Sequence, residues 1–92
     1  MLPIYIIKRT EDVCVSMEMT PLLSLYIRKI PGMVFSEKEG LWVCDKQLLS
    51  FVRDFGSFCV KRYLASEVIE MEGGDGIHHS FADRMPLMDI DR

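Results

Sequence analysis

Three cysteines and two histidines are the residues of this chain best suited to metal or nucleophilic chemistry. Cys14, Cys44 and Cys59 are far apart and lie in apolar stretches, whereas His78 and His79 are adjacent in a glycine-flanked stretch. A zinc site needs four converging ligands, and local pairs such as C-x-x-C, which this chain lacks, help to fix two of them. A nucleophilic cysteine needs a positioned histidine beside it. We therefore expect buried apolar cysteines, no metal or cofactor, and no enzymatic activity.

Paired basic residues are the second set with chemical meaning. They are candidate contacts for phosphates or for an acidic surface, although solvated helix and strand ends also carry such residues. Acidic residues interrupt them and the isoelectric point is about 5.3, so we do not expect tight binding to free DNA. Contact with a nucleic acid already held in a protein complex stays open. The residues concerned are Lys8, Arg9, Arg28, Lys29, Lys61 and Arg62.

The charges divide the chain near Ser66. Residues 1–66 carry nine Lys or Arg and seven Asp or Glu, whereas residues 67–92 carry two and seven. We expect one compact α+β domain over residues 1–72 and an acidic, glycine-flanked C-terminal arm over 73–92. The arm is either a solubilising tail or a segment that becomes ordered on a partner. Met85 and Met88 are its candidate partner-binding residues, because methionine makes adaptable apolar contacts.

The composition indicates a small protein of the cytoplasm. The chain has 92 residues, enough for one domain, and 49% of them are hydrophobic. No stretch approaches the length of a membrane span, and the first apolar residues lack the basic flank of a signal peptide. Three unpaired cysteines are typical of a reducing compartment.

The apolar periodicity of the first half predicts a hairpin and a short helix. Residues 4–9 are rich in β-branched side chains, and residues 13–20 alternate apolar with polar side chains. Thr20 and Pro21 are typical of a helix start. Leu22, Leu25 and Tyr26 fall on one face of that helix at helical spacing.

The second half predicts another hairpin and a longer helix. Residues 33–35 and 41–44 flank a charged turn, where Gly40 supplies a positive φ. Asp45 is the expected N-cap of a helix that ends near Leu64, and its Gly56 is either tolerated or marks close approach to a strand. Residues 66–72 are either a fifth strand or a frayed helix end. The expected fold is α+β: an antiparallel sheet of about four strands in two hairpins with two helices on one face, in the order ββαββα.

In size and format the whole chain resembles the small inhibitors that phages make against host machinery, the anti-CRISPR proteins. No motif defines that group, so the resemblance assigns no residues. It implies an inhibitor in the host cytoplasm that docks on a Cas ribonucleoprotein with its guide RNA. Such a protein blocks target DNA sterically or electrostatically and without turnover. The alternative is a small regulatory or accessory subunit of a bacterial complex, either transcription-associated or toxin-neutralising.

Overall fold

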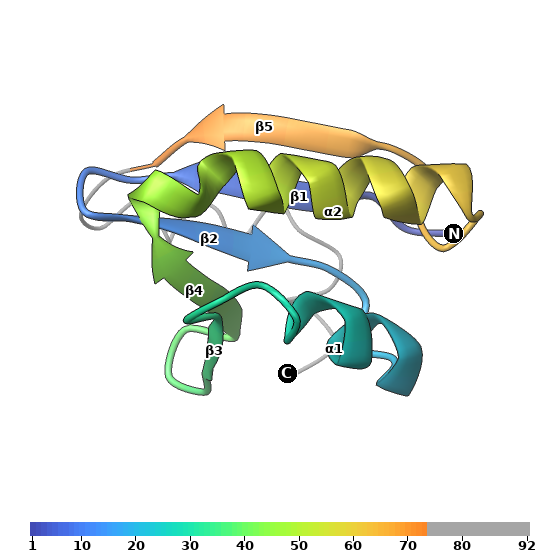
Figure 1. Cartoon of the computed structure of the whole chain (residues 1–92), viewed down its shortest axis with the longest axis horizontal. Helices are drawn as coiled ribbons and strands as arrows, with labels where there is room; N and C mark the ends of the chain where they lie inside the picture. The colour runs from blue at the N-terminus through green and yellow to red at the C-terminus, as the bar shows by residue number, and fades with distance from the viewer. Residues whose placement is uncertain (74–92) are drawn as a thin grey trace.

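The computed structural model describes residues 1–73, which form a five-stranded sheet and two helices (Figure 1). The strand order in the sheet is β3-β4-β2-β1-β5, so the N-terminal strand lies inside the sheet. The α+β class and both predicted hairpins are confirmed. No helix within residues 1–73 is long and apolar enough to cross a membrane. The elements are β1 (Ile4–Lys8), β2 (Asp12–Ser16), α1 (Pro21–Ile27), β3 (Val34–Ser36), β4 (Leu41–Asp45), a 3-10 turn η1 (Lys46–Leu48), α2 (Leu49–Lys61) and β5 (Val68–Glu72).

The fifth strand corrects the expected sheet of about four antiparallel strands. β5 pairs with β1 in parallel, with Ile4 opposite Val68 and Lys8 opposite Glu72, and the sheet is therefore mixed. A parallel neighbour needs a crossover connection, and in the chain α2 precedes β5. The short run of residues 66–72 does not itself distinguish a strand from a helix end. Its structure is decided by pairing with β1, a strand far away in sequence.

Local capping signals determine where the helices begin. The hydroxyl of Thr20 accepts a hydrogen bond from the backbone N–H of Leu23 at 3.1 Å. The carboxylate of Asp45 accepts one from the N–H of Gln47 at 2.8 Å, but it caps the 3-10 turn η1 rather than α2 itself. Gly40 has a φ of +70° in the turn between β3 and β4, as predicted. The turn chemistry of the sequence was therefore a reliable guide.

One face of the sheet carries both helices and the main core. This cluster joins Ile6, Val15 and Trp42 of the sheet to Ile27 of α1 and Val52 of α2. Figure 1 shows α2 lying across the sheet near β1 and β5. Both helices therefore pack on one side, as the sequence predicted.

The buried residues of α1 are not the leucines whose helical spacing stands out in the sequence. Leu23 and Ile27 are its buried residues, whereas Leu22 and Leu25 are 44% and 58% exposed. Both sets fit a helical period, because α1 has apolar residues around much of its circumference. The contacts with the sheet select Leu23 and Ile27, and they leave a leucine-bearing face of α1 at the surface.

Gly56 marks the closest approach of α2 to β5. A Cβ atom at this position would lie 2.8 Å from Cγ2 of Val68, closer than real Cβ atoms come to a neighbour. The absence of a side chain at residue 56 therefore lets the helix rest directly on the edge strand.

We predict that Gly56→Ala destabilises the protein, although alanine favours a helix interior by about 1 kcal/mol. Overpacking against Val68 should outweigh that gain and lower the free energy of unfolding by about 1–2 kcal/mol. In a Val68→Ala background the same change should be neutral or stabilising. Urea unfolding of the four proteins in this double-mutant cycle measures the coupling. A Gly56→Ala variant that is more stable than the parent would contradict the close approach.

Candidate interaction surface

The three cysteines are placed as apolar core residues. Burial raises the pKa of Cys14 to about 12 and that of Cys59 to about 11, and it also raises the pKa of Cys44. These thiols are protonated at neutral pH and are poor nucleophiles. Within residues 1–73, no cluster of three or more His, Cys, Asp or Glu side chains is placed to hold a metal ion. His78, His79, Met85 and Met88, and the arm from residue 74 onward, lie outside the described residues.

Arg9, a predicted partner-binding residue, is engaged in ion pairs inside the protein. Its guanidinium donates to both carboxylate oxygens of Asp12, at 2.6 and 2.9 Å, and to Glu39 at 2.7 Å. These bonds tie the β1–β2 hairpin to the turn between β3 and β4. The hydrogen bonds from Arg9 hold the pKa of Asp12 below its ordinary value. This arrangement supports a structural role for Arg9.

Lys8, the other basic residue of this pair, also faces acidic neighbours. Its ammonium lies 3.4 Å from carboxylate oxygens of Glu70 and of Glu72, both on the adjacent strand β5. The positive charges of Lys8 and Arg9 are thus neutralised by carboxylates within the protein.

The other basic residues predicted to bind a partner, except Lys61, lie over aromatic rings. Lys29 is 5.6 Å from the ring centroid of Tyr26, and Arg62 is 5.2 Å from that of Phe58. The rings of Tyr26 and Phe58 contact each other edge to face, with centroids 5.0 Å apart. This aromatic pair brings the C-terminal ends of α1 and α2 together, with one cation on each side.

Arg28 extends the same cationic region. Its guanidinium lies 5.5 Å from the ring centroid of Trp42, which is buried beneath it. Among residues 1–73, no carboxylate forms an ion pair with Arg28, Lys29 or Arg62. These three cations are therefore available to an external partner in a way that Lys8 and Arg9 are not.

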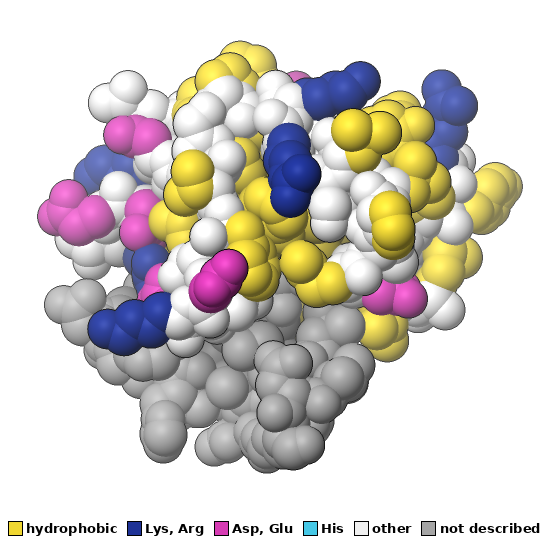
Figure 2. All heavy atoms as spheres, turned by 90° about the horizontal axis from the view of Figure 1, so that it is seen from below, with side chains coloured by type: hydrophobic (Ala, Val, Ile, Leu, Met, Phe, Trp, Pro, Cys, Tyr) yellow, Lys and Arg dark blue, Asp and Glu magenta, His cyan; other side chains and the backbone are white. Residues whose placement is uncertain are grey.

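A groove of about 540 Å³ lies between α1 and α2, and we call it the aromatic groove. One wall consists of three phenylalanines on α2, which lie on one stripe of the helix at positions i, i+4 and i+7. The opposite wall is formed by the end of α1 and the residues that follow it. Phe51 is 51% exposed at this groove. Figure 2 shows hydrophobic side chains exposed on the underside of the molecule, with Lys and Arg side chains among them. The lining residues are Tyr26, Lys29, Ile30, Pro31, Phe51, Asp54, Phe55 and Phe58.

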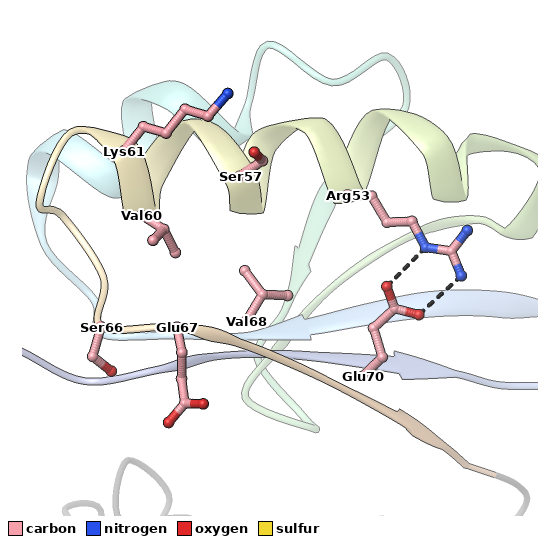
Figure 3. Close-up of a pocket in the computed structure, with 8 residues that line it drawn as sticks. All are labelled: Arg53, Ser57, Val60, Lys61, Ser66, Glu67, Val68 and Glu70. Carbon is pink, nitrogen blue, oxygen red and sulfur yellow. Dashed lines mark hydrogen bonds and ion pairs between the residues drawn. The ribbon is translucent and has the colours of Figure 1, made fainter.

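A second hollow of about 540 Å³ lies between α2 and β5 (Figure 3). Val60 and Val68 point toward each other across it, and Lys61 extends away from it. Arg53 donates two hydrogen bonds to Glu70, at 2.8 and 2.9 Å, and these lower the pKa of the Glu70 carboxyl. The hollow has no aromatic lining, and its Arg53 and Glu70 charges are paired with each other. It is therefore the weaker candidate for a binding site.

The sequence pointed to the basic residues of this surface but not to its aromatic ones. Phe51 and Phe58 are two helical turns apart on α2, whose apolar residues cover a wide arc of the helix. A helix needs only part of so wide an apolar arc to cover a sheet. The spacing of Phe51 and Phe58 was therefore the sequence signal that part of the arc could remain exposed.

Comparison with known proteins identifies no relative of this chain. No protein-family model matches it, and neither the curated proteins nor the solved structures include a significant match. The interpretation of the surface therefore depends on its own chemistry.

We predict that Arg9→Gln lowers the free energy of unfolding by about 1–3 kcal/mol at neutral pH, because it leaves partly buried acids without their donor. A carboxyl whose pKa is lowered by folding stabilises the protein above its unfolded pKa of about 3.9, and this contribution is lost as the pH falls further. The parent should therefore lose more stability than Arg9→Gln between about pH 5 and about pH 2. Urea unfolding across this range measures both effects.

Lys38→Gln is the matched control for Arg9→Gln, because Lys38 is exposed in the turn beside Glu39. It removes the same charge and should change stability by less than about 0.5 kcal/mol. If Arg9→Gln were as stable as the parent, Arg9 would have no structural role and would again be a candidate for partner binding.

Proposed function

We propose that this protein is a non-enzymatic interaction protein that acts by occupying a surface on a larger assembly. The aromatic groove between α1 and α2 is the contact site, and Arg28, Lys29 and Arg62 form its cationic rim. The observation that carries this proposal is the exposure of the Phe51 side chain in a groove that Tyr26, Phe55 and Phe58 also line. Apolar patches of this kind, rimmed by polar residues, are typical of protein interfaces.

The two helices present complementary stripes to a partner. Leu22, Tyr26 and Lys29 are spaced i, i+4 and i+7 along α1 and the residues that follow it. Phe51 and Phe58 are spaced i and i+7 along α2. Tyrosine and arginine are among the residues enriched in binding hot spots, which cluster in well-packed pockets.

The chemistry of the groove favours protein over nucleic acid. Bases stack on open aromatic faces, but Lys29 lies over the ring of Tyr26 and Arg62 lies over that of Phe58. Asp54 also lines the groove and would repel a phosphate. We therefore infer a protein surface with apolar residues at its centre and acidic residues around it.

A Cas effector ribonucleoprotein is the first assembly to test, because the chain resembles anti-CRISPR proteins in size and format. An accessory subunit of another bacterial complex would use the same groove. The test is affinity capture of the tagged full chain from a CRISPR-bearing bacterial lysate, with and without nuclease, read by mass spectrometry. If a Cas effector is recovered in stoichiometric amount both with and without nuclease, the result supports the hypothesis that the protein is an inhibitor. Recovery of another defined complex supports the accessory subunit, and recovery that nuclease abolishes argues against a protein contact.

We predict that Phe51→Ser abolishes capture of the partner while the protein stays folded. Phe51 is exposed, so the free energy of unfolding should change by less than about 1 kcal/mol, whereas loss of an aromatic anchor costs about 2 kcal/mol or more of binding energy. Val34→Ser is the control, because Val34 is 61% exposed and lies on β3, away from the groove. Equal loss of capture in both variants, or in neither, would contradict the assignment of the groove.

A second prediction compares Arg62, which lies over the ring of Phe58, with its neighbour Lys61, which lies at the hollow between α2 and β5. Arg62→Glu should weaken binding at least about tenfold, because reversing a rim charge opposes an acidic partner surface. Lys61→Glu makes the same charge change one residue earlier, beside the hollow between α2 and β5, and should change the affinity by less than about twofold. Titration of the captured partner at low and moderate salt measures the difference. Equal effects of the two reversals would exclude a rim role for Arg62.

A further inference from the structure

The sheet face opposite the helices carries an unbroken apolar row. The registers place Val34 opposite Val43, Val43 opposite Cys14, Cys14 opposite Ile7, and Ile7 opposite Met71. The row therefore crosses all five strands, and we call this side of the sheet the second face. Leu41 and Tyr5 add further apolar surface to it.

A sheet face that is open to water normally alternates polar residues with the buried ones of the other face. Here β1 reads Ile-Tyr-Ile-Ile, so both of its faces are apolar, as in strands that are covered on both sides. Ile7, Cys14 and Leu41 form a separate buried cluster to which neither α1 nor α2 contributes a residue. Among the described residues, the side chains that pack against this cluster are Tyr5, Val43 and Met71, all of them on the strands.

We propose that the second face is the docking site of the protein's own C-terminal segment, residues 74–92. The chain leaves β5 at Gly73, whose N–H donates to the carbonyl of Lys8 on the adjacent strand β1 at 2.8 Å. The glycines in the sequence Gly73-Gly74-Asp75-Gly76 permit a sharp reversal from the sheet edge onto its face. Strands are spaced by about 4.8 Å and an extended chain covers about 3.3 Å per residue, so the segment is long enough to cross all five strands.

The composition of residues 74–92 suits contact with the apolar second face. Six side chains of this segment are large and apolar: Ile77, Phe81, Met85, Leu87, Met88 and Ile90. A second copy of the chain, stacked sheet to sheet, would leave these residues of both copies uncovered. The covalent link also gives the segment an effective concentration in the millimolar range, which favours it over a separate chain. Docking leaves the aromatic groove as the surface for a partner.

Cys14 is a built-in probe of this docking, since its side chain is fully buried on the second face, whereas Cys59 is fully buried in the helix-side core. The native full chain is alkylated with iodoacetamide, and peptide mass spectrometry follows each cysteine. A variant combining Met85→Ser, Leu87→Ser, Met88→Ser and Ile90→Ser should react at Cys14 at least about tenfold faster than the parent. Reaction at Cys59 should not change. The control combines Asp83→Ser, Asp89→Ser and Asp91→Ser, and should leave Cys14 protected.

Equal protection of Cys14 in the parent and the apolar variant would overturn the proposal. So would protection that disappears on dilution as a dimer dissociates, because a second copy would then be the cover. A photo-crosslink on the otherwise unchanged chain provides a test should the serine variant not fold. With p-benzoylphenylalanine in place of Tyr5, the expected product is an intramolecular crosslink to residues 74–92. The same probe in place of Phe51 should give none, and a segment that crosslinks from Phe51 but not from Tyr5 would overturn the proposal.

Discussion

The burial of β1 on both of its faces is the constraint on which the rest of this structure depends. Ile4 and Ile6 lie in the helix-side core, whereas Ile7 lies in the cluster of the second face. Because β1 has strands on both sides, β2 by a hairpin and β5 after a crossover, it leaves no open edge of its own. The chain must then carry α2 over the sheet before β5 can pair. Gly56 permits that helix to lie against the returning strand at Val68.

The aromatic groove is a consequence of helices that carry more apolar surface than one sheet face can cover. α1 buries Leu23 and Ile27 and leaves Leu22 and Leu25 exposed. α2 buries Val52 and Cys59 and leaves Phe51 at the surface. An isolated exposed apolar residue needs no explanation, but Phe51 shares its groove with Tyr26, Phe55 and Phe58, and an apolar groove of this kind is typical of a binding surface.

The cations are separated into two functional groups by their neighbours rather than by their residue types. Lys8 and Arg9 lie beside carboxylates, so their charges stabilise the hairpin and the edge strand. Arg28, Lys29 and Arg62 lie over aromatic rings, where their charge is not neutralised by a described acid. Charges of the second kind steer a partner and set specificity, while the aromatic residues beneath them supply the apolar contact.

The sequence by itself determined the features that depend on near neighbours. The α+β class, both hairpins, the cap at Thr20 and the positive φ of Gly40 follow from turn chemistry and from periodicity within short windows. It also indicated the basic residues of the candidate site. Only the tertiary structure decided the parallel pairing of β5, the buried side of α1 and the division of the cations. Each of these depends on residues distant in sequence that meet in space, and local patterns do not encode which of two apolar faces, or which of several carboxylates, a side chain will contact.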